Sequence, residues 1–367
     1  MAGREETKYW ISMAKIPGLG PVRLKRIFEH FDSMQRAWEA DIENMRGAGI
    51  EQKIAEDIVF MRERLNPDEE LLAVQKEGIN VVTLADNNYP KLLKEIYSPP
   101  AILYYRGGLS GEGDEFAVAV VGTRKYSSYG KQATMSIVGE LANQGITTVS
   151  GLAMGIDALV HEATVNNGGR TIAVLGSGIG EADIYPSINR YLAKKVIEKG
   201  GLILSEYPPG TVPIKQNFPQ RNRIISGLSL ATLVIEAPET SGALLTAKYA
   251  LEQNRDVMAV PGSIYSPNAV GPNNLIKMGA KLVNSANDVL EALNMQQVKE
   301  FIDNRKISPD TSEEAVILEI LSNEPLHVDE IIKKTNLTVA QANSTLVLME
   351  MKGKLKNLGN MMYVAAR

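Results

Sequence analysis

The segment FPQRNRIISGLS, residues 218–229, combines residue types that bind anions. Phe218 precedes two basic side chains, Arg221 and Arg223, and an apolar run follows them. No Asp or Glu occurs from 208 to 234, although the whole chain has a net charge of −4. A basic window without a local acid is typical of a surface that receives a negatively charged ligand.

The neighbours of this segment indicate which kind of anion is bound. Lys215 precedes Phe218 by three residues, and Asn222 separates the two arginines. Pro219 favours the first turn of a helix, which would place Arg221 in the N-terminal turn, where a cation is unfavourable unless an anion offsets it. An aromatic ring beside cations is also a stacking platform for the bases of a single strand. The pattern predicts a binding site for a nucleic-acid strand.

A structural role is the alternative for the same residues. Phe218 would then belong to the core, and the arginines would bind carbonyl oxygens or pair with Glu206 or Glu236. The missing local acids favour the anion-binding interpretation over this one.

A second basic turn lies at 120–132, VVGTRKYSSYGKQ. Gly122 permits a tight turn, Thr123 and the following N–H groups open toward a helix, and Arg124 and two lysines add charge. The turn lacks the G-x-G-x-x-G pattern, so dinucleotide binding is not expected. The alternative is a surface turn with solvated cations.

A third turn, within 237–262, begins a helix at Ser241 and Gly242. Thr246 and Lys248 follow on that helix. A helix N-terminus with small residues suits a phosphate. The alternative is an N-capped helix with a solvated lysine.

Catalytic residues are harder to find. Asp157 and His161 stand at i and i+4 in the segment 150–169, and a further glycine-rich turn occupies 175–186. An acid–base pair is one interpretation, but no nucleophile accompanies it, so packing is favoured. We therefore expect a protein that binds a polyanion and is not an enzyme.

The composition excludes several other classes. The chain has 367 residues, no cysteine and three histidines far apart, so no metal site and no cofactor are expected. No apolar run of ~18 residues suggests a membrane helix, and the N-terminus lacks an apolar signal core. We expect a cytoplasmic protein that does not associate with membranes.

The elements that position these turns follow from hydrophobic periodicity. Short apolar runs alternate with helical segments, which predicts an α/β fold with a Rossmann-like, doubly wound, mostly parallel sheet. Ligands on such sheets bind beyond the carboxyl ends of the strands. The predicted strands are 79–84, 101–107, 116–122, 147–151, 171–176, 202–206, 231–237 and 256–262.

Smaller modules flank the sheet domain. Residues 1–75 read as helices around glycine turns, which is typical of helix-hairpin-helix or SAM-like modules that either bind phosphate or only pack. The sheet domain is assigned to 76–294 and a polar linker to 295–311. Residues 312–367 have the rhythm of a winged helix, with a turn at Gly359. The expected recognition helix, 338–351, contains no Lys or Arg, so it is not expected to bind phosphate.

Several motifs in the sheet domain resemble the DNA-processing protein A (DprA/Smf) family. The resemblance covers about 105–290 with many motifs in order, and the flanking modules are similar to those of three-domain members. The motifs are VVGTR (120–124), SGLAMGIDALVHEAT (150–164), TIAVLGSGI (171–179), YP (185–186), LSEYPPG (204–210), FPQRNRIISGLS (218–229), SGALLTAKYALEQNR (241–255), VMAVPG (257–262) and NNLIKMGA (273–280).

The resemblance implies a protein that binds single-stranded DNA entering the cytoplasm in natural transformation. Such a protein protects the strand, helps load RecA onto it and works against single-stranded-DNA-binding protein. Family members form homodimers through the Rossmann-like domain.

The resemblance also implies the positions of the sites. The expected single-stranded-DNA-binding residues are Gly122, Thr123, Arg124, Lys215, Phe218, Arg221, Asn222, Arg223, Ser241, Gly242 and Lys248. The expected dimer interface includes Asn274, Leu275 and Ile276.

Two other functions compete with this one. The segment 241–253 resembles the PGG-x-GT-x-x-E motif of lysine-decarboxylase-like nucleotide hydrolases, which predicts an enzyme acting on a small nucleotide. However, Ser241-Gly242 replaces the double glycine, and Glu252 lies too far along the helix. A transcription factor acting through the winged helix is the third possibility, and the uncharged third helix argues against it.

Overall fold

The structure is a computed structural model that describes most of the chain. The chain divides into two compact units, Met1–Asn294 and Met295–Arg367. The predicted linker, 295–311, lies almost entirely outside the described residues. The described residues are 4–109, 114–293, 310–321, 326–335, 337–352, 354–357, 359 and 361–365.

The first unit contains a nine-stranded sheet in the order β1-β2-β6-β5-β4-β3-β7-β8-β9. Its strands are β1 Asn80–Thr83, β2 Ile102–Gly107, β3 Val118–Val121, β4 Thr148–Ser150, β5 Thr171–Leu175, β6 Leu202–Ser205, β7 Ala231–Val234, β8 Asp256–Ala259 and β9 Lys281–Leu282.

The seven strands from β6 to β9 in this order are parallel, whereas β1 and β2 run antiparallel to their neighbours. The central strands are buried along their whole length, as expected for a parallel sheet with helices on both faces. The predicted α/β, Rossmann-like fold is confirmed, and all eight predicted strands form.

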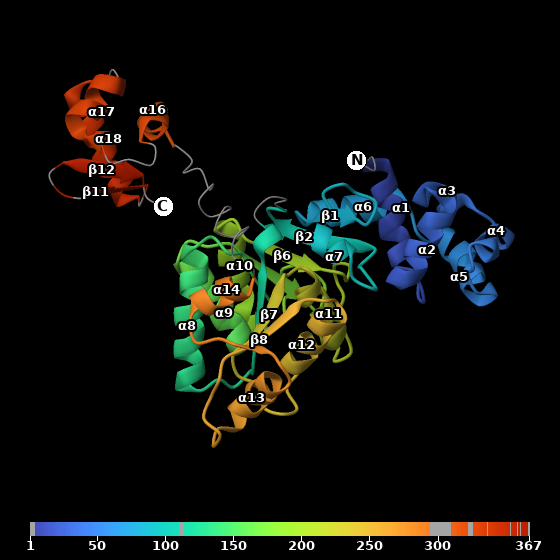
Figure 1. Ribbon diagram of the computed structural model, residues 1–367. Coiled ribbons are helices and arrows are strands. Elements are labelled where there is room, and N and C mark those ends of the chain that lie inside the picture. Colours follow the sequence, from blue (N-terminus) through green and yellow to red (C-terminus); the bar gives the residue numbers. More distant parts are fainter. Residues whose placement is uncertain are drawn as a thin grey trace. The chain divides into compact units, whose positions relative to one another are not determined.

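Helices cover both faces of this sheet. Figure 1 shows α8, α9 and α10 on one side and α11 and α12 on the other. These helices and the last two of the unit are α8 Ser128–Asn143, α9 Ile156–Asn166, α10 Arg190–Glu198, α11 Asn217–Gly227, α12 Ala243–Glu252, α13 Val270–Lys277 and α14 Ala286–Ala292.

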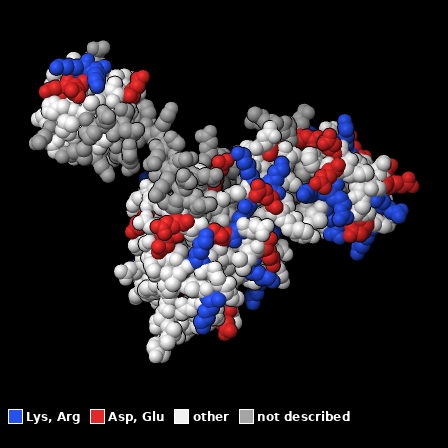
Figure 2. Space-filling model, in the orientation of Figure 1, with Lys and Arg blue, Asp and Glu red and all other residues white. Residues whose placement is uncertain are grey.

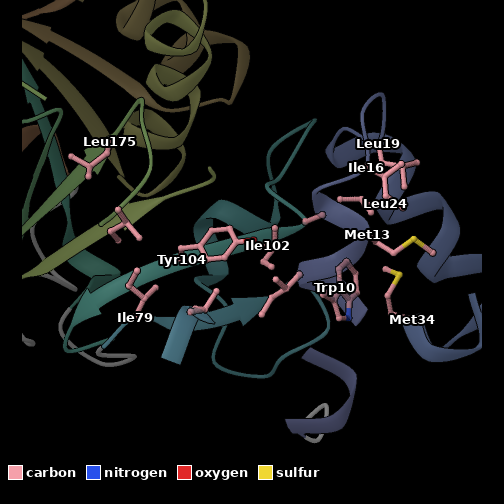
Figure 3. Packing of buried hydrophobic residues seen from close by; sticks show 14 of the residues in the cluster. Trp10, Met13, Ile16, Leu19, Leu24, Met34, Ile79, Ile102, Tyr104 and Leu175 are labelled. Atoms are coloured by element: carbon pink, nitrogen blue, oxygen red, sulfur yellow. The ribbon is translucent and has the colours of Figure 1, made fainter. Parts of the chain in front are cut away.

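The N-terminal helices share a hydrophobic cluster with the sheet. Figure 3 shows Trp10 and Leu24 from these helices, and Leu19 from the loop between two of them, in one cluster with Ile102 and Tyr104 of β2. Because this cluster is continuous, a domain boundary at residue 75 stays a prediction. The helices are α1 Arg4–Ala14, α2 Pro21–Phe31, α3 Met34–Glu39, α4 Ile42–Gly47, α5 Gln52–Arg62 and α6 Pro67–Lys76, and a short α7, Lys91–Lys94, follows β1.

The second unit is a small winged helix. Its three-stranded sheet has the order β10-β12-β11, and Ile317, Ile331 and Leu346 pack in its core. Its elements are α16 Ser312–Ile320, β10 Leu326–His327, α17 Val328–Thr335, α18 Val339–Met351, β11 Leu355–Asn357 and β12 Met362–Ala365.

The surface charge is mixed. Figure 2 shows basic and acidic side chains interspersed on the visible face, without one large basic field. In the part of the chain that the structure describes, no helix has the length and apolar character needed to span a membrane. Any strong attraction for a polyanion must therefore come from a local group of cations.

Candidate nucleic-acid interface

A cavity of about 870 Å³ opens where the strand order of the sheet reverses. Strands β3 and β7 are neighbours there, and the chain leaves them toward opposite halves of the sheet, which separates their loops. We call this the switch-point cavity. Nine of the predicted DNA-binding residues line it: Gly122, Thr123, Arg124, Lys215, Phe218, Arg221, Asn222, Ser241 and Gly242.

The turn after β3 packs closely against the next helix. A Cβ atom on Gly122 would lie 2.6 Å from the Ile156 side chain, so this position requires glycine. The Thr123 N–H donates to the Glu236 carbonyl, and the Thr123 carbonyl accepts from the Ile156 N–H at 3.1 Å. The turn therefore holds Arg124, the next residue, at the cavity with its side chain exposed.

The N-terminus of α8, which follows this turn, already has an anion. The carboxylate of Glu236 accepts from the Ser127 N–H at 2.9 Å and from the Ser127 hydroxyl. The Ser127 hydroxyl in turn caps the helix by accepting from the Gly130 N–H. The Ser127 and Gly130 N–H groups are therefore engaged within the protein, and the cationic side chains that this turn presents to the cavity are Arg124 and Lys125.

Phe218 stands between a cation and a second ring. Its centroid lies 5.9 Å from the guanidinium carbon of Arg124 and 5.9 Å from the centroid of the Tyr185 ring. A Cβ atom on Gly176 would lie 2.9 Å from the Phe218 ring, so the ring packs over this glycine. The ring is half-buried and lines the cavity, whereas Lys215 is exposed at the same wall.

Arg221 is bound by the protein itself. Its side chain is 4 % exposed, and its Nη1 donates to the carbonyls of Gly151 and Val174. Because α11 begins at Asn217, Arg221 lies in the second turn and not in the N-terminal turn as predicted. Burial lowers the pKa of Arg221 to about 10, and the nearby Asp157 opposes this shift. Arg221 therefore braces the cavity wall more than it offers a free charge.

Arg223 forms an ion pair, so the expectation that the cations of segment 208–234 are uncompensated is wrong for this residue. Its Nη2 lies 2.6 and 2.5 Å from the two carboxylate oxygens of Glu206, and its Nη1 donates to the Ser98 carbonyl. Glu206 stands just before the acid-free window in the sequence, so one of the cations of that window, Arg223, is neutralised in space. Arg223 does not line the switch-point cavity.

The turn after β7 contributes the opposite wall. The Asn222 amide donates to the Gly242 carbonyl at 3.1 Å, which ties α11 to the start of α12. The Ser241 hydroxyl accepts from the Ala243 N–H at 3.3 Å. Lys248, two turns further along α12, is exposed, lies 3.8 Å from Glu252 and does not line the cavity.

Asp157 and His161 make separate structural contacts. A carboxylate oxygen of Asp157 accepts from the Gly151 N–H at 3.2 Å, and burial raises the pKa of Asp157. Nδ1 of His161 lies 2.8 Å from the Thr171 hydroxyl, and burial lowers the pKa of His161 to about 3. A histidine that stays neutral at physiological pH in the core is suited to packing.

Lys125, Tyr185 and Asn268 are among the lining residues that were not predicted as site residues. The Asn268 amide donates to the Lys125 carbonyl at 2.9 Å and to Glu236, and so supports the β3 turn from 143 residues away. No local pattern could reveal such a contact. The sequence could have indicated Tyr185, because this residue stands near the end of the glycine-rich turn at 175–186.

The cavity is positively charged. Four cationic side chains line it, Arg124, Lys125, Lys215 and Arg221, against one carboxylate, Asp157. Neither Arg124 nor Lys215 forms an ion pair with any described residue. Among those same residues, no cluster of His, Asp or Glu is arranged to hold a metal ion. The cavity can therefore hold a flexible anion against an aromatic wall.

The winged-helix unit presents a different surface. Its third described helix, α18, exposes Val347, Leu348 and Met351. The cations that follow α18 are engaged, since Nζ of Lys352 lies 2.9 Å from Asp310 and 2.8 Å from Glu314. A phosphate-binding role for this helix therefore remains unexpected.

Family models match both units. The model described as DNA recombination-mediator protein A matches residues 80–294. The model described as the DprA winged helix domain matches residues 303–360. The first match contains every residue of the switch-point cavity.

Curated relatives and solved structures agree with these matches. Protein Smf of Synechocystis is 39 % identical over 99 % of both chains, and DNA processing protein DprA of Bacillus subtilis is 44 % identical over 63 % of this chain and 78 % of its own. The structure of DprA from Streptococcus pneumoniae covers 77 % of this chain and 97 % of its own, with 36 % identity and a TM-score of 0.68. A structure of DNA processing protein A from Helicobacter pylori, described for its single-stranded DNA binding mode, covers 59 % of this chain and 95 % of its own, with 28 % identity and a TM-score of 0.52.

Proposed function

The chain belongs to the DNA recombination-mediator protein A family, and on that premise we propose that it binds single-stranded DNA taken up in natural transformation. The observation that carries this proposal is the pairing of free cations with an aromatic ring in the switch-point cavity. Arg124 and Lys215 face the same space as Phe218 and form no ion pair with a described residue.

This arrangement suits a single strand better than a duplex. The phosphates of the strand bind Arg124, Lys125 and Lys215, and one base stacks on Phe218, which requires an unpaired base. The cavity spans 870 Å³, which is large for one mononucleotide but suitable for a short stretch of strand. Backbone contacts and stacking carry little sequence information, so the binding is insensitive to sequence.

The bound strand is then passed on and not modified. We propose that the protein shields the strand in the cytoplasm, helps load RecA onto it and works against single-stranded-DNA-binding protein. Asp157 and His161 are both engaged inside the fold, which supports a binding role over a catalytic one.

We also propose a homodimer formed around α13. Asn274 is exposed and Ile276 half-buried, whereas Leu275 packs into the core and therefore supports the helix from behind. Asn273 holds the loop that carries Ile264 and Tyr265, through reciprocal hydrogen bonds to Gly262. Ile264, Tyr265 and Met278 are all exposed, and a dimer formed around α13 would bury apolar side chains of this kind.

Fluorescence anisotropy with a labelled oligo-dT tests the binding proposal. Wild type is expected to bind the single strand more tightly than a duplex of equal length, and Arg124→Ala/Lys215→Ala to bind at least tenfold more weakly. The control Lys76→Ala/Lys199→Ala removes two exposed cations outside the cavity and keeps wild-type affinity. Release of free base from a nucleoside monophosphate, without oligonucleotide binding, would instead support a nucleotide-processing enzyme.

A further inference from the structure

We propose that the single strand does not end in the switch-point cavity but continues into a second cavity against the N-terminal helices. This inference rests on the proposed function and assigns the N-terminal helices a direct contact with DNA. The second cavity has a volume of about 500 Å³, within the ~300–1,000 Å³ typical of ligand sites. We call it the junction cavity, since α2 and β2 line one side and residues 206–208, Gln220 and Arg223 the other.

The two cavities share one wall. Phe218, Arg221 and Asn222 fall at i, i+3 and i+4 on one face of α11 and line the switch-point cavity. Gln220 and Arg223, on another face of the same helix, line the junction cavity. One helix, about 10 Å across, therefore separates the two spaces. A strand that stacks on Phe218 needs only to pass over exposed Gln220 to enter the second space.

The junction cavity has the chemistry of a base-binding site. Apolar side chains such as Leu19 and Ile102, which Figure 3 shows, line the cavity and offer van der Waals contact for a base. The Tyr207 hydroxyl and the Gln220 amide supply polar contacts for a base edge, and they lie 3.4 Å apart, too far for a strong bond to each other. The Arg223–Glu206 ion pair forms a neutral polar floor.

A smaller cavity of about 260 Å³ continues in the same direction. It shares Pro21, Val22 and Ser98 with the junction cavity, and Lys25, Arg26 and Tyr97 also line it. The Tyr97 side chain is 99 % exposed. Lys25 forms an ion pair at 3.8 Å with Glu29, which lines the same cavity, and Nη1 of Arg26 donates to the Gly49 carbonyl at 3.0 Å. An exposed ring beside two cations is the combination that binds a single strand.

Val22 allows a test that leaves the fold intact. It lies at the mouth of both cavities, is 51 % exposed and stands in the first turn of α2, where an acidic residue is favourable for the helix. Full-length Val22→Glu, Val22→Lys and Val22→Gln are compared on oligo-dT of ~5 and ~20 nucleotides, which span the range of single-strand site sizes.

The expected effect depends on oligonucleotide length. For the long oligonucleotide, Val22→Glu lowers the affinity about fivefold, the effect of one charge facing a phosphate across water, and Val22→Lys raises it, while Val22→Gln stays near wild type. For the short one, which the switch-point cavity alone accommodates, all variants equal wild type. Equal affinities of all variants for the long oligonucleotide, or equal changes at both lengths, would overturn the inference.

Photo-crosslinking gives an independent readout. A long oligonucleotide with 5-iododeoxyuridine is expected to crosslink to Tyr97 or Tyr207, and Tyr97→Ala removes the Tyr97 product without affecting the fold of this exposed site. Crosslinks confined to Phe218 and Tyr185 would overturn the inference while leaving the proposed function intact. If wild type binds neither oligonucleotide, the proposed function itself fails.

Discussion

The guanidinium carbon of Arg124 lies 5.9 Å from the centre of the Phe218 ring. Arg124 comes from the turn after β3 and Phe218 from the start of α11, 94 residues later. The contact places a cation and a stacking surface within reach of one nucleotide. A nucleotide can therefore contact Arg124 through its phosphate and Phe218 through its base. Free phosphate or a free base could make only one of these two contacts.

Replacing Phe218 distinguishes the contribution of base stacking to DNA affinity from the contribution of charge. Phe218→Ala is expected to weaken oligo-dT binding by about 1–3 kcal/mol, or about 5- to 150-fold, because one stacked base is lost. The salt dependence of binding stays unchanged, since no phosphate contact is removed. Both quantities are measured by anisotropy at several salt concentrations.

Phe60 provides a matched control for this experiment. Like Phe218 it has an arginine over its ring, since the guanidinium carbon of Arg64 lies 4.0 Å from its centroid, but it is exposed and lines neither cavity. Phe60→Ala should bind DNA as wild type does. Equal losses in the two variants would contradict a specific stacking role for Phe218.

Removing Arg223 is expected to affect folding more than DNA binding. The Arg223 and Glu206 side chains are only 13 % and 12 % exposed, so Arg223→Ala leaves a buried carboxylate without its cation. Such losses destabilise proteins by about 3–5 kcal/mol. Urea unfolding of Arg223→Ala alone and with Glu206→Gln measures the effect, and the double variant should recover most of the stability.

The pH dependence of that variant has a defined sign. Burial raises the pKa of Glu206 even with Arg223 present, and removing the cation raises it further. The folded state then binds a proton that the unfolded state, with a pKa of ~4.3, releases, so stability falls as pH rises above ~4. Arg223→Ala should be least stable near neutral pH and recover toward pH 5. If the loss of stability in Arg223→Ala relative to wild type were independent of pH, this account would be contradicted.

Buried His161 should make the wild type sensitive to acid. Its pKa is lowered to about 3 in the folded state, whereas an unfolded histidine has a pKa of ~6.5. Between these values the unfolded state binds more protons, so stability falls as pH decreases, by about 2 kcal/mol from pH 7 to pH 5.

Unfolding of His161→Gln at the two pH values tests this effect. The variant should lose that part of the pH dependence, whatever its stability at pH 7. His30→Gln, at an exposed position, serves as the control for the effect of a histidine-to-glutamine substitution. Identical pH dependence in wild type and His161→Gln would show that His161 is not the group responsible.

The proposed dimer surface can be tested by charge insertion. Met278 is 75 % exposed next to α13, so Met278→Asp should shift the protein from dimer to monomer without a loss of unfolding stability. Sedimentation velocity gives the mass. Leu72→Asp, at an exposed position on α6, should remain dimeric. A monomeric wild type, or a dimer that survives Met278→Asp, would contradict the α13 interface.

The sheet could be predicted from the sequence because its buried strands are local apolar runs. TIAVL and LILS, for example, are buried at every residue. The sequence also indicated that the turn with Arg124 and the segment with Phe218 lie at one edge of the sheet, because both follow the carboxyl ends of predicted parallel strands.

Long-range pairing could not be predicted in the same way. Glu206 neutralises Arg223 only because β6 and α11 bring them together, and Glu236 caps α8 from 109 residues away. The partner of a charge depends on tertiary packing, so an acid-free stretch of sequence does not ensure a free charge. The junction cavity was equally hidden, because it requires α2 and α11 to lie near each other.

The salt dependence of oligo-dT affinity tests the central claim most directly. Each phosphate contact to a single strand contributes about −0.7 to the slope of log affinity against log salt. If Arg124 and Lys215 each bind a phosphate, Arg124→Ala/Lys215→Ala should bind at least tenfold more weakly, with a slope shallower by about 1.4. An unchanged slope and affinity in this variant, with wild type still binding the strand, would show that the switch-point cavity is not where the DNA binds.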